Sequence, residues 1–221
     1  KSDANDWFRK RRKKMIGIID YGSGNIQAIA TIYKNLNIEH QVLNKPEDLK
    51  KADKFILPGV GAFDATMQQL IDSGLKDKLN ELVLEKKVPI LGICVGLQVM
   101  GYKSDEGDLP GLGWIAGKVS RFDETKIKFK PKLPHMGWNT INDVHKHMLF
   151  KGIDKDFGFY FVHSFYFECE SENNILTTSR YSFEFTSAIF SGHIIGTQFH
   201  PEKSHGNGVQ LFKNFADLKL C

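Results

Sequence analysis

The stretch from Val88 to Gln98 constrains the fold more than any other part of this chain. A short apolar run, of the length of a buried strand, ends on Gly92-Ile-Cys94-Val-Gly96, and a helical pattern follows it. This is the strand–turn–helix arrangement of a nucleophile elbow, with cysteine in the position of serine. Such a turn holds its central residue in strained backbone geometry, and side chains in place of the two glycines would clash with the neighbouring strand and helix.

Two interpretations of Cys94 follow from this stretch. In the first, Cys94 is a nucleophile at the start of a helix, where the helix dipole and free N–H groups favour the thiolate. In the second, it is a buried core cysteine between two packing glycines, because free cysteine is among the most buried residue types. The stretch taken alone does not distinguish the two, and two later segments favour the nucleophile.

The composition excludes several classes of protein. Hydrophobic residues make up 41% of the 221 residues and charged residues 25%, which is ordinary for a globular domain. No apolar run approaches the roughly 18 residues of a membrane span, and the N-terminal stretch lacks the apolar core of a secretory signal. The 3 cysteines are too few and too scattered for a disulfide framework, so we expect a reducing, cytoplasmic environment.

The positive charge of the chain belongs to its first residues. Residues 1–14 hold seven Lys or Arg and two Asp, a net charge of +5, whereas the whole chain carries +4, so residues 15–221 carry −1. Because Met15 opens the first strand pattern, we predict that residues 1–14 are a non-native or disordered basic leader. A nucleic-acid-binding arm is the disfavoured alternative, since the near-neutral remainder does not continue a basic groove.

The first hundred residues alternate between strand and helix patterns. Strands are expected at 15–21, up to 42–44, at 55–57 before Pro58, and at 88–93; helices are expected at 26–36 and at 67–83, with a break near Ser73-Gly74. This alternation predicts a parallel sheet with both faces covered by helices. Active sites in such sheets lie beyond the carboxyl ends of the strands, so the loops at 22–25 and 58–61 are expected to converge on Cys94.

The second half of the chain reads differently. After a glycine-rich and charged loop at 101–113, short β-type runs are expected at 117–122, 126–129, 159–167, 175–179, 186–190 and 193–199, before a closing helix with Val209, Phe212, Phe215 and Leu218 on one side. The sequence therefore predicts a single α/β domain over residues 15–221. Its mainly parallel sheet is flanked by helices and carries an antiparallel β extension.

His200 and Glu202 form the second informative pair. They lie two residues apart at the end of an extended run, and the period of two points both side chains to the same side. A carboxylate there can accept a hydrogen bond from one ring nitrogen and leave the other nitrogen free to face a thiol. Together with Cys94 this supplies a nucleophile, a base and an orienting group. Alone, a His-Pro-Glu sequence is better explained as a turn at a strand end.

The third segment, Pro58-Gly-Val60-Gly61, is expected to approach the substrate with its backbone. Its glycines let an N–H group come close to a substrate oxygen. The N–H of Val60 and the N–H of Val95, just after the nucleophile, are therefore candidates for an oxyanion hole. An ordinary strand-to-helix turn is the simpler alternative for this segment.

With these motifs in view, the sequence resembles the class I (triad) glutamine amidotransferases. The elbow Gly92-Ile-Cys94-Val-Gly-Leu-Gln98 and the stretch Phe199-His200-Pro-Glu202 carry this resemblance. Within the family, the chain is most similar to the glutaminase subunits of imidazole glycerol phosphate synthase, an enzyme of histidine biosynthesis. Five further segments narrow the resemblance, which runs from Met15 to about Leu218: 20–25, 58–63, 134–139, 160–164 and 200–204.

The resemblance implies a flavodoxin-like fold of the class I glutamine amidotransferase type and a Cys-His-Glu triad. Cys94 would be the nucleophile, His200 the general base and acid, and Glu202 the residue that orients His200. The positions that hold glutamine match Gly59, Gln98, Ser164 and Phe165, and those near the partner face match Asn25, Met136, Trp138 and Lys203.

The activity that the resemblance implies is hydrolysis of L-glutamine to glutamate and ammonia. The ammonia would pass to a (β/α)₈ cyclase subunit in a heterodimer, where it would enter the imidazole ring of imidazole glycerol phosphate. The resemblance implies no metal, no organic cofactor, no nucleic acid and no membrane.

Three alternatives stay open at this point. Val95 and Leu97 stand where leucine and methionine are common, and Phe165 replaces a usual tyrosine, which leaves room for a paralogous subunit that feeds ammonia to a sugar-amidating enzyme. A stand-alone cysteine hydrolase of the same fold would need no partner face, and Met136-Gly-Trp138 argues against it. A non-catalytic binding module is disfavoured by the complete set of three candidate catalytic residues.

Overall fold

The computed structural model describes residues 14–219. The predicted leader, apart from Lys14, lies outside the described residues. Within residues 14–219, no helix is both long enough and apolar enough to cross a membrane.

An eight-stranded sheet forms the centre of the protein. In spatial order its strands are β2 (His40–Leu43), β1 (Ile16–Ile19), β3 (Lys54–Gly59), β4 (Ile90–Cys94), β12 (Ile194–Thr197), β11 (Phe183–Ser191), β10 (Ile175–Tyr181) and β7 (Asn142–Asp143). The strands from β2 to β12 are parallel, and those from β12 to β7 pair antiparallel. The predicted mainly parallel sheet with an antiparallel extension is therefore confirmed.

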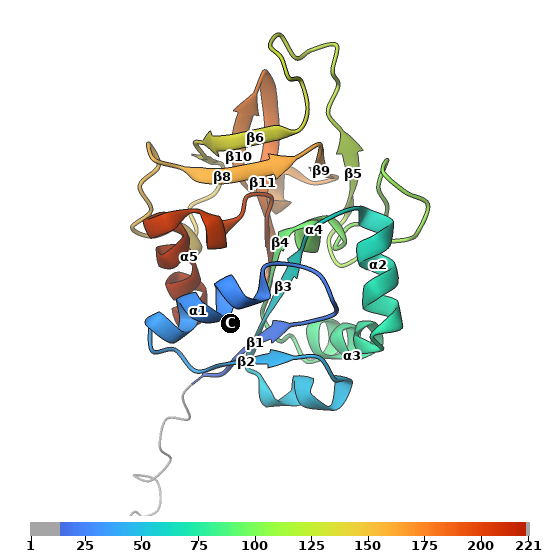
Figure 1. The fold of residues 1–221 in the computed structure, drawn as a ribbon, viewed down its shortest axis with the longest axis vertical. Coiled ribbons are helices and arrows are strands. Elements are labelled where there is room, and N and C mark those ends of the chain that lie inside the picture. The colour runs from blue at the N-terminus through green and yellow to red at the C-terminus, as the bar shows by residue number, and fades with distance from the viewer. Residues whose placement is uncertain (1–13, 220–221) are drawn as a thin grey trace, which may run out of the picture.

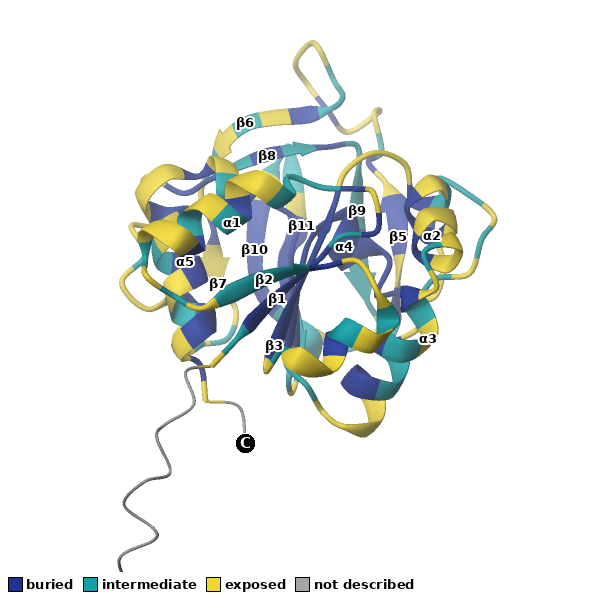
Figure 2. Ribbon diagram, turned by 60° about the horizontal axis from the view of Figure 1, so that its bottom comes forward, coloured by how far each residue is buried: buried dark blue, intermediate teal, exposed yellow. Residues whose placement is uncertain are grey.

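Helices cover both faces of the parallel half. Helices α1 (Ile26–Asn35) and α5 (His205–Asp217) lie on one side, and α2 (Phe63–Asp72) and α3 (Leu75–Asn80) lie on the other (Figure 1). Figure 2 shows that strands β1, β3 and β4 between them are buried, whereas the outer faces of the helices are exposed. This is the pattern expected of an α/β sheet whose apolar strands need cover on both faces.

The remaining elements are short. They are the single turn α4 (Val95–Gln98), the 3₁₀ helices η1 (Pro46–Lys51), η3 (Met148–Phe150), η4 (Glu172–Asn174) and η5 (Pro201–Lys203), and the π-helical turn η2 (Glu81–Glu85) that continues α3. The predicted break at Ser73-Gly74 separates α2 from α3, with Gly74 at a φ of 70°. Only glycine adopts this left-handed conformation without strain.

Two small antiparallel sheets lie above the carboxyl ends of the parallel strands (Figure 1). One pairs β6 (His135–Asn139) with β8 (Phe159–His163), and the other pairs β5 (Gly117–Arg121) with β9 (Phe165–Cys169). The run predicted as one strand at 159–167 is thus two strands, which separate at Ser164 and join different sheets. This separation places Ser164 and Phe165 at the edge of the candidate site.

Pro58 does not end the third strand, contrary to the prediction. Strand β3 continues to Gly59, and Pro58 pairs with Ile93 of β4. The N–H groups of β3 alternate in direction, and that of Phe55 faces β4. The backbone nitrogen of Pro58, which carries no hydrogen, therefore faces the side of β1, where the pairing of β3 with β1 has already ended at Ile56. The strand tolerates proline because no hydrogen bond is lost there.

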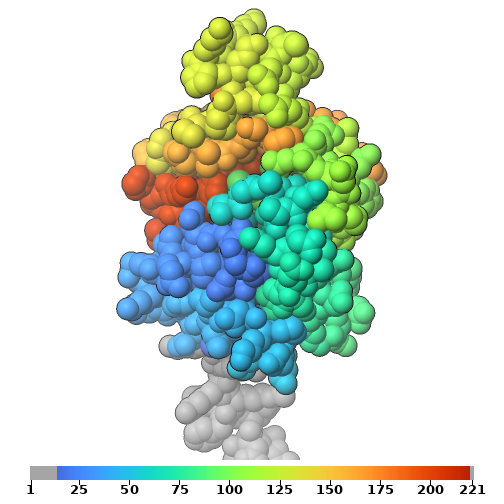
Figure 3. All heavy atoms as spheres, turned by 45° about the vertical axis from the view of Figure 1, so that its right-hand side comes forward, coloured from blue at the N-terminus to red at the C-terminus, as the bar shows by residue number. Residues whose placement is uncertain are grey.

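The predicted strand at 126–129 is also wrong. These residues form a loop that projects from the body, seen as the yellow-green lobe at the top of Figure 3. Ile127 is buried, but Phe129 is exposed and lies against Tyr181 with the ring centroids 4.9 Å apart. Alternating apolar residues indicate a strand only where a neighbouring strand is available for pairing.

The buried ammonium group of Lys54 holds the end of α5 against the sheet. Lys54 begins β3 and is 2% exposed. Its Nζ donates hydrogen bonds to the carbonyl oxygens of Phe215, Ala216 and Leu218, at 2.6, 2.8 and 2.6 Å. Carbonyl groups at the end of a helix lack intrahelical donors, so a side-chain cation there satisfies them.

Replacing Lys54 with methionine should lower the free energy of unfolding by about 2–4 kcal/mol, because three carbonyl groups lose a charged donor. Urea unfolding followed by circular dichroism measures this change. Lys86→Met, at an exposed lysine, is the control and should change the stability by less than about 0.5 kcal/mol. Equal stability of the two variants would contradict a role of Lys54 in holding α5.

Candidate active site

The chain turns at Cys94 as an elbow requires. Cys94 ends β4 with a φ of 55° and a ψ of −111°, a strained conformation for a residue other than glycine. A Cβ on Gly96 would lie 1.9 Å from the carbonyl oxygen of Leu57, and one on Gly92 would lie 2.5 Å from the carbonyl oxygen of Gly96. Both glycines are therefore required by space. The helix after the elbow is a single turn, so its dipole contributes little to a thiolate.

Three adjacent strands bring the predicted residues together. In the sheet, Gly59 of β3 pairs with Cys94 of β4, and Ile93 of β4 pairs with Thr197 of β12. His200 follows the end of β12 closely, so it leaves the sheet at the same edge as Cys94. This is the carboxyl edge of the parallel strands, where α/β sheets hold their sites.

His200 and Glu202 form a buried pair. The Nδ1 atom of His200 lies 2.8 Å from Oε1 of Glu202, and both side chains are 2% exposed. The expected extended geometry is wrong, because the chain turns at Pro201 into η5 (Pro201–Lys203). This turn, rather than the alternation of a strand, places the carboxylate beside the ring. Proline fixes its own φ near the helical value and so favours the turn.

The surroundings of His200 keep its ring charged. Burial lowers the pKa of His200, but the Cys94 sulfur and the Glu202 carboxylate outweigh burial and raise that pKa to about 10. Burial raises the pKa of Glu202, but hydrogen bonds from His200 and Asn25 outweigh burial and hold that pKa below its ordinary value. The site is therefore an imidazolium between a sulfur nucleophile and a carboxylate.

The backbone of Val60 is bonded to Ser23. The N–H of Val60 donates to Oγ of Ser23 at 3.0 Å, and the hydroxyl of Ser23 donates to the carbonyl oxygen of Val60 at 2.9 Å. The N–H that was expected in the oxyanion hole thus has a protein acceptor in this structure. Val60 lies between Gly59 and Gly61, which leaves its peptide free to turn. Val95 begins α4, where an N–H group has no intrahelical acceptor.

A pocket of about 380 Å³ opens at Cys94. Most of the predicted site residues line this pocket: Val60, Cys94, Val95, Gln98, Ser164, Phe165, His200 and Lys203. Gly59 does not line the pocket, and a Cβ added to it would be 2.5 Å from the N atom of Gly96. Among residues 14–219, no group of three or more His, Cys, Asp or Glu side chains is arranged to hold a metal ion.

Gln198 is a site residue that sequence reasoning missed. Its Nε2 lies 3.7 Å from the Cys94 sulfur, and its Oε1 accepts a hydrogen bond from Nε2 of Gln98 at 3.1 Å. Gln98 also donates to the carbonyl oxygen of Phe165 at 3.2 Å. Gln98 therefore acts indirectly. It holds Gln198, which lies beside the Cys94 sulfur, and the backbone of Phe165 in the pocket wall. The only sequence signal for Gln198 was its place in the run that ends at His200.

Glu106 was also missed, because residues 101–113 predicted only a loop. The structure places Glu106 in the pocket wall, where its Oε2 accepts a hydrogen bond from the N–H of Phe63 at 2.8 Å. This bond ties the loop to the first turn of α2. A carboxylate in this wall offers an acceptor to a cationic group of a substrate.

Two residues expected at a partner face are exposed on β6. Met136 is 61% exposed and Trp138 is 43% exposed, on the outward side of the strand. The ring of Trp138 contacts Phe157 and His205, with centroids 4.5 and 5.4 Å apart. These contacts order an apolar surface close to the pocket.

The other two residues expected at a partner face differ from each other. Lys203 lines the pocket, and its Nζ lies 5.7 Å from the ring centroid of Tyr160. Asn25 instead donates from Nδ2 to Oε1 of Glu202 at 2.7 Å. Its side chain thus contacts the candidate catalytic group directly.

The sequence of the chain matches known proteins along almost its whole length. Residues 17–218 match the family described as Glutamine amidotransferase class-I. The chain is 47% identical over 204 residues to the imidazole glycerol phosphate synthase subunit HisH of Leptospira borgpetersenii, and 48% identical over 204 residues to that of Bdellovibrio bacteriovorus. Each match covers 92% of this chain and 100% of the relative.

Solved structures share the fold at low sequence identity. A structure described as a glutamine amidotransferase has a TM-score of 0.68 at 19% identity, with 92% of this chain and 99% of that chain covered. The structure of PurLQS from Thermotoga maritima has a TM-score of 0.67 at 16% identity, with 93% and 98% covered. These two structures have the same fold as this chain.

Proposed function

The chain belongs to the class-I glutamine amidotransferases, and we propose that it is the glutaminase subunit of an imidazole glycerol phosphate synthase. It hydrolyses L-glutamine to glutamate and ammonia, and the ammonia serves histidine biosynthesis. The observation that carries this proposal is the geometry of Cys94, His200 and Glu202 at one edge of the sheet, in a chain that is similar over 92% of its length to a HisH subunit.

The first half of the reaction releases ammonia. The Cys94 thiolate attacks the side-chain amide carbon of glutamine, and the carbonyl electron pair moves to oxygen. The N–H groups of Val95 and Val60 stabilise this oxyanion, once the Val60 peptide has turned away from Ser23. The imidazolium of His200 gives its proton to the amide nitrogen as the carbon–nitrogen bond breaks, which leaves ammonia and a thioester on Cys94.

The second half regenerates the site. Neutral His200 removes a proton from water, and the resulting hydroxide adds to the thioester carbon. The carbon–sulfur bond then breaks, the new γ-carboxyl group loses its proton to solvent as glutamate leaves, and the thiolate and the imidazolium are restored. Glu202 keeps Nδ1 of His200 protonated in both halves of the reaction and stabilises the ring whenever it is charged.

Glutamine binds in the pocket through its amino-acid end. We assign its α-ammonium group to Glu106 and its remaining contacts to the walls formed by Ser164 and Phe165. Because the hydrogens of the Gln98 amide are already donated to protein acceptors, we assign to Gln98 the support of these walls.

The partner is a (β/α)₈ cyclase that docks over the mouth of the pocket. Met136 and Trp138 provide the apolar contact, with Lys203 beside the opening. Ammonia then passes directly to the cyclase and enters imidazole glycerol phosphate, with an aminoimidazole carboxamide ribotide as co-product. We propose a heterodimer in the cytoplasm, where the Cys94 thiol stays reduced.

Adding the cyclase and its nucleotide ligand should raise the glutaminase kcat by roughly 10²–10³-fold, the usual contribution of one oxyanion donor. The reason is that the Val60 N–H is bonded to Ser23 in this structure and must turn toward the substrate. A partner that binds only the competent arrangement shifts the population toward it. Steady-state glutamate production, with and without each addition, measures this effect.

Trp138→Ala should weaken activation by the cyclase, whereas Tyr102→Ala, at an exposed aromatic residue in the loop after α4, is the control. Full activity of the isolated subunit, unaffected by Trp138→Ala, would refute the partner model and favour a stand-alone hydrolase. Glutamine hydrolysis without glutamine-dependent formation of imidazole glycerol phosphate would favour the sugar-amidating alternative.

A further inference from the structure

One loop holds three parts of the candidate site through alternate residues. The hydroxyl of Tyr21 donates to the carbonyl oxygen of Pro58, and Ser23 bonds the backbone of Val60. The third residue, Asn25, reaches Glu202 from the end of the loop. The contacts to Pro58 and Val60 hold the segment that carries the candidate oxyanion-hole N–H. The contact of Asn25 instead holds Glu202 of the candidate catalytic triad.

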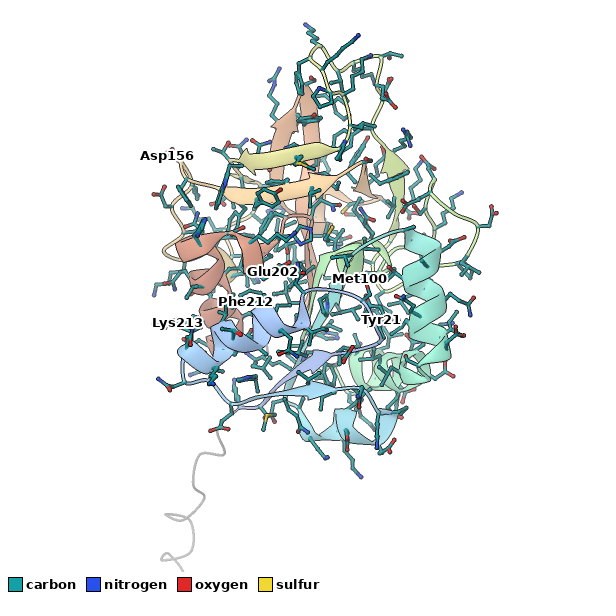
Figure 4. All side chains as sticks on the ribbon, viewed as in Figure 1. Tyr21, Met100, Asp156, Glu202, Phe212 and Lys213 are labelled. Atoms are coloured by element: carbon teal, nitrogen blue, oxygen red, sulfur yellow. The ribbon has the colours of Figure 1, made fainter. Side chains whose placement is uncertain are left out.

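Asn25 gives up its usual local role for this contact. It occupies the N-cap position of α1, where asparagine is one of the most favoured residues because its side chain accepts a hydrogen bond from the helix. The Asn25 side chain forms no such cap bond. Its Nδ2 donates instead to Oε1 of Glu202 at 2.7 Å, across 177 positions of sequence. Figure 4 shows Glu202 beside the end of α1 at which the helix begins.

Glu202 depends on few side-chain donors. Its Oε1 accepts from Nδ1 of His200 at 2.8 Å and from Asn25 at 2.7 Å. Its Oε2 is buried and has no hydrogen-bond partner among the described residues. A buried carboxylate with one unpartnered oxygen can rotate about its last bond, and each donor to Oε1 opposes that rotation.

We propose that Asn25 is a positioning residue of the glutaminase reaction, which holds Oε1 of Glu202 toward Nδ1 of His200 and supports its negative charge. This inference rests on the proposed function, because it assigns Asn25 to the same triad. Asn25 does not touch the substrate. It acts through Glu202 on the charged ring of His200.

The test compares Asn25→Ala with Asn25→Asp at saturating cyclase, so that a change in docking does not affect the rates. Asn25→Ala removes the donor and should lower kcat by about 10–100-fold, with KM for glutamine changed less than about twofold. Asn25→Asp has almost the same shape and is itself a favoured N-cap residue. It also places a second carboxylate against Glu202, so kcat should fall at least as far as in Asn25→Ala.

The two variants separate a positioning role from a structural one. If Asn25 only stabilised α1, the Asp variant would melt at the wild-type temperature or higher and keep its kcat. A loss of kcat in a variant of undiminished thermal stability supports the proposal. Asn35→Ala, at the exposed last residue of α1, is the matched control and should leave both kcat and KM unchanged.

Two other results would overturn the inference. One is a kcat of Asn25→Asp within about twofold of the wild type, and the other is a loss confined to KM. A wild-type chain that hydrolyses no glutamine with its cyclase would instead refute the proposed function. The two failures are therefore distinguishable in one set of assays.

Discussion

Replacing Cys94 with serine or alanine should abolish glutamine hydrolysis, lowering kcat by at least about 10⁴-fold while the fold stays intact. Alanine has no nucleophile. A serine hydroxyl is a far weaker acid than a thiol. The imidazolium of His200, which is paired with Glu202, therefore cannot keep the serine oxygen ionised. Glutamate production with the cyclase present measures the activity, and circular dichroism checks the fold.

Cys169→Ser is the control for this experiment. Burial raises the pKa of the Cys169 thiol to about 12, so it stays protonated and is a poor nucleophile. We expect wild-type kcat in this variant. Activity of Cys94→Ala close to that of the wild type would remove Cys94 from the mechanism and leave it as a core cysteine.

Replacing Glu202 with glutamine should lower kcat by about 10³–10⁴-fold and change KM for glutamine much less. The neutral amide no longer stabilises the imidazolium, and it can hold His200 in the wrong tautomer. Because Glu202 contributes to raising the pKa of His200 to about 10, that pKa should fall in the variant. The alkaline limb of the rate profile should therefore move to lower pH.

The pH profile of kcat/KM, measured for both proteins, checks the assignment of Glu202. His200 of the free enzyme must be protonated to release ammonia, so the wild-type kcat/KM should fall as the pH rises through about 10. An unchanged kcat in Glu202→Gln, with an altered KM, would move Glu202 from catalysis to substrate binding.

The parallel half of the fold was predictable because its signals are local. Apolar runs such as 88–93 have the length of buried strands, and the helical patterns between them fix the order of elements. The elbow was predictable for the same reason, since Gly92 and Gly96 each lie two residues from Cys94. Because the turn has no room for a Cβ at either glycine, it can be recognised from five consecutive residues.

The hydrogen bonds that position the groups of the candidate site were not predictable, because they join residues far apart in the chain. Asn25 was assigned to a partner face by resemblance, and its bond to Glu202 depends on how α1 lies against η5. The bond of Ser23 to Val60 likewise depends on two loops at neighbouring strand ends. Pro58 was misread for a related reason: the β1 side of its backbone nitrogen needs no hydrogen bond, because the pairing of β3 with β1 ends at Ile56, and that is a property of the sheet.

The pairing of β4 with β12 has a consequence for how the protein reaches its active state. Each residue of β12 pairs with one about a hundred positions earlier, as Gly196 does with Gly92. Contacts of such long sequence separation require slow loop closure and tend to form late in folding. The β1–β4 segment can collapse first, with Cys94 in its elbow but with no base beside it. On dilution from urea, recovery of glutaminase activity should thus lag behind recovery of helical circular dichroism. The length of this lag measures how long β12 takes to pair with β4.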